Sequence, residues 1–297
     1  MATLPAAVPC RENEPLSKYT SYRIGGPARF FFLPQAPEHV FQIGKFLKET
    51  RTPYFILGNG SNVLAPDEGF PGAVICTKEI APKIEFQGNR VRASASTLNA
   101  RLLRACAEKG LGGLDSLAGV PGNLGGAVFM NAGTASGWID SVIEEVEAVS
   151  VSGQSRKIPA EELKYSYREQ HFLREGEIVW SATLQLREEE PAQILARLVE
   201  SMKKRKAAQP IELPSCGSVF RNPPGHNAWK LIADAGLRGF ARGGARISAK
   251  HCNFIVNEGG ARKEDVLFLI EAARDKVKAM SGIELQPEVV VMEPRFL

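Results

Sequence analysis

The chain has 297 residues, about twice the length of a typical single domain, so we expect two or three domains. Its hydrophobic fraction of 44% and charged fraction of 24% are those of an ordinary globular protein, and they exclude a disordered chain, a collagen-like repeat and a coiled coil. With 37 basic and 33 acidic residues, the net charge of +4 is too small for a protein that coats nucleic acid.

The positive charge is concentrated in one part of the chain. Residues 201–262 hold eleven Lys or Arg and three Asp or Glu, an excess of +8, so the other 235 residues sum to −4. Composition alone leaves two interpretations open. The segment forms either a solvated basic face or a pocket for an anionic ligand.

The first third of the chain alternates between strand and helix. Residues 28–33 form a mostly apolar run that predicts a strand, and Pro37 suits the first turn of a helix whose apolar residues follow at helical spacing. Residues 54–57 predict a second buried strand. This βαβ unit indicates a first domain over residues 1–71.

A second domain is expected over residues 72–190. Its predicted strands cover residues 74–76, 84–86, 91–95, 146–150 and 178–186, the last two in an antiparallel sheet. Residues 97–109 predict an amphipathic helix that ends before Gly110 and carries Leu98, Leu102 and Cys106 on one stripe.

The charged, proline-punctuated segment 188–191 marks the start of a third domain, over residues 191–297. Helices are predicted at 194–206, 228–235 and 263–280. The last of these helices has a single apolar face, made of Val266, Leu269, Ile270, Ala273 and Val277, and Gly282 follows it as a stop signal.

Cysteine usage and the N-terminal sequence point to the cytoplasm. The five cysteines are an odd number at wide spacings, and no Cys/His set has zinc-ligand spacing, so we expect no metal site. The N-terminus has no basic segment followed by a long apolar run, and no apolar stretch approaches the roughly 20 residues of a membrane helix. We therefore expect a cytoplasmic protein with no membrane partner.

Two glycine clusters are candidates for binding a cofactor. The first, Gly58-Asn59-Gly60-Ser61-Asn62, follows a predicted strand, and the second runs from Gly119 to Gly126 as Gly-Val-Pro-Gly-Asn-Leu-Gly-Gly. Glycine allows tight turns and a close approach of backbone N–H groups to a phosphate. Structural turns and close helix packing explain the same residues, so a pyrophosphate site and a purely structural role both stay open.

Three further residues are candidates for chemistry. Arg168 follows two tyrosines at strand-like spacing and offers a planar fork for a carboxylate, although an isolated arginine is usually a surface charge. Ser218 lies in a small-residue loop that lacks the GxSxG spacing of a hydrolase, so it is either part of a structural turn or a proton donor. Glu288 precedes an apolar strand and is either an edge charge or a positioned acid.

Together these segments resemble the UDP-N-acetylenolpyruvoylglucosamine reductases, the flavoenzymes of bacterial peptidoglycan precursor synthesis. The similarity covers nearly the whole chain, from Tyr19 to Val289. It rests on the joint occurrence of residues 19–26, 58–62, 119–126, 130–133, 165–168, 217–222 and 287–288. The spacing between Tyr167 and the last domain resembles the subclass that lacks an extra tyrosine-bearing substrate loop.

The resemblance implies an α+β protein, with a two-lobed FAD-binding fold of the PCMH type followed by an α+β substrate-binding domain. It implies noncovalent FAD between the first two domains, NADPH as the co-substrate and a UDP-sugar as the substrate. The FAD-binding residues would then be Gly58, Asn59, Gly60, Ser61, Asn62, Gly119, Val120, Pro121, Gly122, Asn123, Gly125 and Gly126.

In that family hydride reaches C3 of the enolpyruvyl group and a serine protonates C2. Carried onto this chain, Ser218 is the proton donor, and Arg168 and Glu288 flank the enolpyruvyl carboxylate and stabilise the enol. Candidates for the UDP diphosphate and carboxylate region are Arg205, Lys206, Arg221 and Asn222, of which the first two could equally form a solvated helix end.

Two other functions remain as alternatives. The chain could be another flavin oxidoreductase of the same fold, such as an alcohol or sugar oxidase, although neither glycine cluster contains the His or Cys that often tethers flavin in those enzymes. The basic segment could also bind nucleic acid, but the 8% aromatic content gives no excess of stacking residues. We expect a monomer that binds no nucleic acid.

Overall fold

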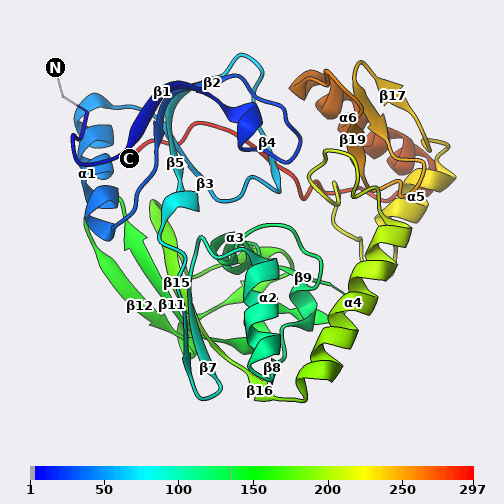
Figure 1. Cartoon of the computed structure of the whole chain (residues 1–297). Coiled ribbons are helices and arrows are strands. Elements are labelled where there is room, and N and C mark those ends of the chain that lie inside the picture. The colour runs from blue at the N-terminus through cyan, green and yellow to red at the C-terminus, as the bar shows by residue number, and fades with distance from the viewer. Residues whose placement is uncertain (1–3, 135) are drawn as a thin grey trace.

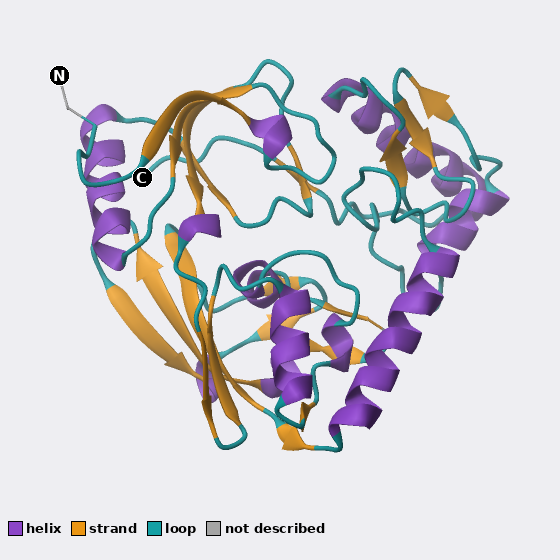
Figure 2. Cartoon of the chain, in the orientation of Figure 1, coloured by secondary structure: helices purple, strands orange, loops and turns teal. Residues whose placement is uncertain are grey.

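The computed structural model describes residues 4–134 and 136–297, so Met1–Thr3, with which the expected first domain begins, lie outside the described range. Two lobes built on β-sheets face each other, and a third unit is attached beside them by the long helix α4 (Pro191–Ala208) (Figure 1). Helices and strands occur in all three parts (Figure 2). No helix within the described ranges has both the length and the hydropathy that crossing a membrane requires.

The first lobe confirms the predicted strand, helix and strand. Its four-stranded sheet has the order β1-β2-β5-β3, with β2, β5 and β3 parallel and β1 antiparallel to β2. These elements are β1 (Cys10–Pro15), β2 (Pro27–Phe32), α1 (Pro37–Thr50), β3 (Tyr54–Leu57) and β5 (Phe70–Cys76). Helix α1 covers the sheet with Val40, Ile43 and Leu47, which are fully buried or nearly so.

The expected boundary between residues 71 and 72 falls inside a strand. Ala73, Val74 and Ile75 of β5 pair with both β2 and β3, so β5 is a central strand of the first sheet. A short buried run such as Val74–Cys76 has the same local pattern in either sheet. Only its pairing partners assign it to the first lobe.

The second lobe contains a five-stranded antiparallel sheet of order β12-β11-β15-β7-β6, as predicted for its strands 146–150 and 178–186. The strands are β6 (Ile84–Gln87), β7 (Arg90–Ser94), β11 (Ile143–Ser150), β12 (Ser155–Pro159) and β15 (Glu177–Gln185). Helices α2 (Asn99–Glu108) and α3 (Leu124–Phe129) pack on this lobe. Of the predicted apolar stripe, Leu102 and Cys106 are buried, whereas Leu98 precedes α2 and is 49% exposed.

Several two-residue strands complete the lobes. They are β4 (Val63–Leu64), β8 (Leu111–Gly112), β9 (Gly133–Thr134), β10 (Gly137–Trp138), β13 (Tyr165–Ser166), β14 (Glu169–Gln170) and β16 (Arg187–Glu188). The segment 165–168 is therefore not one strand. Tyr167 and Arg168 form the turn of the β13–β14 hairpin, and Arg168 has a left-handed φ of 60°.

The third unit packs helices α5 and α6 and a small sheet around its own core, and helix α4 leads into it. It contains α4, α5 (Ala228–Asp234), β17 (Ala241–Arg242), β18 (Ala245–Ile247), β19 (Ile255–Asn257), α6 (Lys263–Ser281) and β20 (Val290–Val291). All five apolar residues predicted on one face of α6 are buried, and Gly282 ends that helix with a left-handed φ of 72°.

Segments near both chain ends cross between the first lobe and the third unit. Strand β20 pairs in parallel with β4, and Arg295 bridges Tyr54 of β3. In return, Tyr22, Ile24 and Leu64 contribute to the hydrophobic core of the third unit. Parts of the chain that are far apart in sequence are thereby brought around one cavity.

Candidate active site

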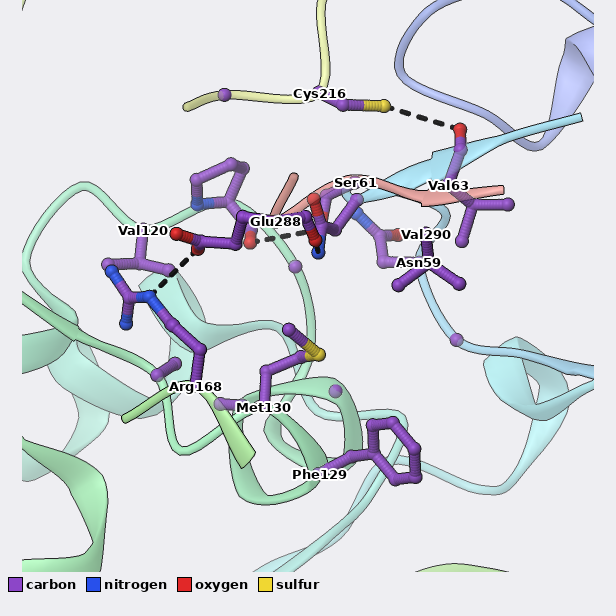
Figure 3. Close-up of a pocket in the computed structure, with 18 of the residues that line it drawn as sticks. Asn59, Ser61, Val63, Val120, Phe129, Met130, Arg168, Cys216, Glu288 and Val290 are labelled. Carbon is purple, nitrogen blue, oxygen red and sulfur yellow. Dashed lines mark hydrogen bonds and ion pairs between the residues drawn. The ribbon is translucent and has the colours of Figure 1, made fainter. Parts of the chain in front are cut away.

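A cavity of about 900 Å³ lies where the two lobes and the third unit meet. Its wall includes the first glycine cluster, most of the second, the turn at Arg168, and the segments that carry Ser218 and Glu288. Figure 3 shows Arg168 and Glu288 pointing toward each other in this cavity, with Asn59, Ser61 and Val120 close by. A volume of this size is typical of a site for a large organic ligand.

The first glycine cluster reaches the cavity directly after β3, and all five of its residues line the wall. Gly60 has a left-handed φ of 67°, and a Cβ there would lie 1.9 Å from the carbonyl oxygen of Tyr19. Glycine is therefore required at this position for both conformational and steric reasons.

The two glycine clusters contact each other. The Ser61 hydroxyl donates a hydrogen bond to the Pro121 carbonyl over 3.2 Å, and a Cβ on Gly122 would lie 3.0 Å from Ser61 Oγ. Asn123 precedes α3, where its Oδ1 accepts from the Gly126 N–H over 3.1 Å. Its Nδ2 is buried and has no hydrogen-bond partner among the described residues.

Gly119 is the one predicted cofactor residue outside the cavity wall. Its φ is 72°, and a Cβ there would lie 2.8 Å from Cδ of Arg205 and 2.9 Å from the sulfur of Met202. The close approach of helix α4 therefore explains this glycine. For Gly119 the structural interpretation is the better one.

Arg168 and Glu288 form an ion pair, with Arg168 Nε 2.8 Å from Glu288 Oε1. The two terminal nitrogens of Arg168 donate to the carbonyls of Gly133, over 2.9 Å, and Asn131, over 3.4 Å. Asn62 Nδ2 donates to the Glu288 carbonyl over 2.9 Å, which ties Glu288 to the first glycine cluster. Burial raises the pKa of the Glu288 carboxyl above its usual value, and the positive charges of Arg168 and Arg221 oppose that shift only in part.

Ser218 lies in the cavity wall on a loop that is fixed at both sides. Before it, the Cys216 thiol donates to the carbonyl of Val63 over 3.2 Å. After it, the Val219 carbonyl accepts from the N–H of Glu288 over 2.7 Å. The serine and the carboxyl are therefore held on neighbouring backbone segments.

Of the four candidates for the substrate phosphates, two line the cavity. Arg205 and Asn222 are part of the wall. Burial lowers the pKa of Arg205, and the nearby charge of Arg168 lowers it further, so the two guanidinium groups would gain from an anion between them.

Lys206 and Arg221 are not in the wall. Lys206 is exposed, and the Arg221 guanidinium lies 4.0 Å from a carboxyl oxygen of Glu169. Residues that are adjacent on a helix point about 100° apart, so α4 turns Arg205 into the cavity while Lys206 is left exposed.

The structure adds wall residues that the sequence did not single out as site residues. They include Asn99, Phe129, Met130, Thr134, Leu173, Arg174, Gln209, Asn227, Trp229, Asn253 and Arg295. His251 also lies in the wall. Burial lowers the pKa of His251, so its ring is held toward the neutral form. Most of these residues belong to ordinary strands and loops, and no local pattern distinguishes them from structural residues.

Comparisons with known proteins agree with this architecture. A family model described as "FAD binding domain" matches residues 28–158, and one described as "UDP-N-acetylenolpyruvoylglucosamine reductase, C-terminal domain" matches residues 209–292. The UDP-N-acetylenolpyruvoylglucosamine reductase of Syntrophotalea carbinolica is 42% identical over 284 residues, which cover 96% of this chain and 94% of the relative. That of Clostridium botulinum is 39% identical over 282 residues, 95% of this chain and 92% of the relative.

The fold is also found in a solved structure. The crystal structure of UDP-N-acetylenolpyruvylglucosamine reductase from Thermus caldophilus matches with a TM-score of 0.80 and 36% identity, covering 96% of this chain and 99% of the other. These matches confirm the predicted α+β class, a FAD-binding fold followed by a substrate-binding domain. The chain therefore belongs to the UDP-N-acetylenolpyruvoylglucosamine reductases, the FAD-dependent oxidoreductases that reduce the enolpyruvyl UDP-sugar in peptidoglycan synthesis.

Proposed function

We propose that this protein reduces UDP-N-acetylglucosamine enolpyruvate to UDP-N-acetylmuramate with NADPH, and that Arg168, Glu288 and Ser218 act on the enolpyruvyl group. The observation that carries these roles is the Arg168–Glu288 pair, 2.8 Å apart, in the same cavity wall as Ser218 and both glycine clusters.

The residues of the wall fit FAD. The two glycine clusters lie close against each other in the wall, since a Cβ on Gly58 would lie 3.1 Å from Asn123 Oδ1 and one on Gly122 would lie 3.0 Å from Ser61 Oγ. Asn123 Nδ2 and Asn99 Oδ1 are buried without partners among the described residues, so they can serve as a donor and an acceptor for a polar ligand. We propose that Gly58–Asn62 and Val120–Gly126 hold the cofactor noncovalently.

Arg168 supplies positive charge where negative charge develops. When bound, FAD supplies the hydride chemistry between NADPH and C3 of the substrate. Addition of hydride at C3 moves charge onto the substrate carboxylate and makes it enolic. The partly buried Arg168 binds that state more tightly than the ground state, which lowers the barrier.

Glu288 faces the same carboxylate and must not repel it. Its raised pKa keeps a larger share of the carboxyl protonated than in a free glutamate. A protonated carboxyl can donate a hydrogen bond to the enolic oxygen. Burial of Glu288 therefore makes an acidic side chain compatible with an anionic intermediate.

Ser218 donates a proton to C2. A serine hydroxyl is a weak acid, so this role needs a strongly basic carbon and a fixed position. The hydrogen bonds of Cys216 and Glu288 on either side hold the loop in place. The arrangement provides such a position in the cavity wall.

Half-reaction kinetics test the proposed function. The purified protein should be yellow, and acid precipitation of a sample should release the flavin into the supernatant. In the intact protein, NADPH should bleach the yellow colour, and UDP-N-acetylglucosamine enolpyruvate should restore it. A colourless protein, or colour that stays in the acid pellet, contradicts the proposed cofactor site. Bleaching by NADPH without recovery on the enolpyruvyl substrate contradicts the proposed substrate.

We also infer a cytoplasmic monomer. All five cysteines are free thiols in the structure, as suits a reducing compartment. Light scattering tests the oligomeric state: a monomer has a mass of 32.3 kDa, and a larger particle contradicts the inference.

A further inference from the structure

The guanidinium of Arg168 lies against two aromatic rings that the proposed reaction does not use. Its Cζ is 5.1 Å from the ring centroid of Trp138 and 5.7 Å from that of Tyr167, within the roughly 6 Å at which a cation is attracted to a ring. The two rings meet edge to face, with centroids 4.9 Å apart and planes at 80°. Neither ring lines the cavity, so both contact Arg168 from outside the cavity wall.

The hairpin that carries Trp138 also receives one of the two guanidinium hydrogen bonds. Trp138 pairs with Gly133 in the β9–β10 hairpin, and the Gly133 carbonyl accepts from Arg168 over 2.9 Å. A Cβ on Gly133 would lie 2.2 Å from the Gly137 carbonyl oxygen, so only glycine allows this close pairing. The side chain of Asn131 donates to the Ser166 carbonyl over 3.2 Å, which fastens this segment to the hairpin of Arg168.

The contacts around the Arg168 guanidinium restrict the conformations of its side chain. Arginine has a long side chain that loses much rotamer freedom when it is fixed in one geometry. The two carbonyls restrain the terminal nitrogens, and the rings restrain the plane of the guanidinium. The Nε–H is buried without a hydrogen-bond partner among the described residues, although a carboxyl oxygen of Glu288 lies 2.8 Å from the nitrogen.

We propose that Trp138 is a positioning residue that, together with the ring of Tyr167, orients the Arg168 guanidinium toward the substrate carboxylate. This inference rests on the proposed role of Arg168. It assigns a specific function to a residue that touches neither the cavity nor the reacting atoms. In this proposal Trp138 acts through Arg168.

Substitutions of Trp138 in the holoenzyme test the inference. In Trp138→Leu the enolpyruvyl half-reaction should slow by roughly 5- to 30-fold, as expected for loss of one desolvated cation–π contact. The NADPH half-reaction and the flavin content should stay unchanged. Trp138→Phe keeps an aromatic face and should retain most of the rate. Trp180→Leu, which replaces a half-buried tryptophan outside the cavity wall, serves as the matched control.

A second readout does not depend on activity. In ¹⁵N-labelled holoenzyme the Arg168 Nε–H resonance, identified by its loss in Arg168→Lys, should move downfield in Trp138→Leu because the ring current of the indole is gone. An unmoved resonance overturns the inference, and so does a moved resonance with an unchanged enolpyruvyl half-reaction. Equal losses in both half-reactions and in flavin content would show a merely structural role and would also overturn it. Full activity of Arg168→Lys would instead contradict the proposed role of Arg168. Activity of this variant and the resonance shift in Trp138→Leu are separate measurements, so the two failures can be told apart.

Discussion

Arg168 and Glu288 join two separate parts of the protein through one ion pair, with Nε and Oε1 2.8 Å apart. Arg168 lies in a hairpin turn of the second lobe, and Glu288 precedes β20, which pairs with β4 of the first lobe. The pair therefore forms only when the lobes and the returning C-terminal segment are assembled. This relationship makes the site sensitive to changes at either residue.

Glu288→Gln should change how stability depends on pH. In the folded protein the Glu288 carboxyl keeps its proton above the ordinary pKa of 4.5, at a pH at which the unfolded chain has released it. The folded state then binds more protons in this window, so the free energy of unfolding falls as the pH rises through it. Glutamine cannot ionise and should lack this decline.

Urea unfolding of both proteins between about pH 4 and 8 measures the effect. The difference in unfolding free energy, wild type minus Glu288→Gln, should decrease with rising pH. A constant difference over this range would show that the pKa of Glu288 is not raised in the folded protein.

Ser218→Ala should separate the two half-reactions. The reduction by NADPH should stay at the wild-type rate, and the recovery with the enolpyruvyl substrate should slow by roughly 10²–10⁴-fold, the usual effect of losing a positioned acid. Stopped-flow absorbance measures both. Ser215→Ala, in the same loop but outside the cavity wall, should leave both rates unchanged, and normal recovery in Ser218→Ala would disprove the assignment.

Gly60→Ala should unfold more easily and lose flavin. A side chain there adopts an unfavourable left-handed φ of 67° and would also meet the Tyr19 carbonyl at 1.9 Å. The backbone strain should lower the free energy of unfolding by roughly 1–2 kcal/mol, and the overpacking should lower it by about 1–3 kcal/mol more. Denaturant titration and the flavin-to-protein ratio check this.

Gly88→Ala is the control for the backbone strain. Gly88 has a φ of 59°, and no atom of the described residues lies within 4 Å of the position that a Cβ would take. The substitution should lower the free energy of unfolding only by the backbone strain, about 1–2 kcal/mol, and the variant should retain its flavin. Equal losses in the two variants would mean that the close approach at Tyr19 has no effect.

Arg205→Met and Lys206→Met should differ although the residues are neighbours. Arg205 is half-buried in the cavity wall, whereas Lys206 is exposed and outside it. Loss of a charged hydrogen bond worth roughly 1.5–3 kcal/mol should weaken UDP-sugar binding about 10- to 150-fold in the first variant. Calorimetry on the oxidised holoenzyme should show less than a twofold change for Lys206→Met, and similar losses in both would contradict the proposed anion site.

The sequence was sufficient for features that depend on neighbours along the chain. Helix α6 could be predicted with its buried face and its stop at Gly282, because a 3.6-residue apolar period and a left-handed glycine are local signals. The glycine clusters were also visible, and their joint occurrence with Arg168, Ser218 and Glu288 identified the family. All three of these residues lie in the same cavity wall.

Tertiary structure decided what depends on partners distant in sequence. The central place of β5 in the first sheet follows from its pairing with β2 and β3. The local sequence of a buried apolar strand does not indicate which sheet the strand joins. Arg205 and Lys206 have the same local chemistry, and only the docking of α4 turns one into the cavity and the other to solvent.

Gly119 differs from its neighbours for a related reason. Its conformation serves contact with Met202 and Arg205 of α4, and not the cavity. The concentration of positive charge in residues 201–262 was likewise a property of composition. Folding directs part of it, through Arg205, into the cavity and leaves Lys206 at the surface, because helix geometry separates adjacent side chains by about 100°.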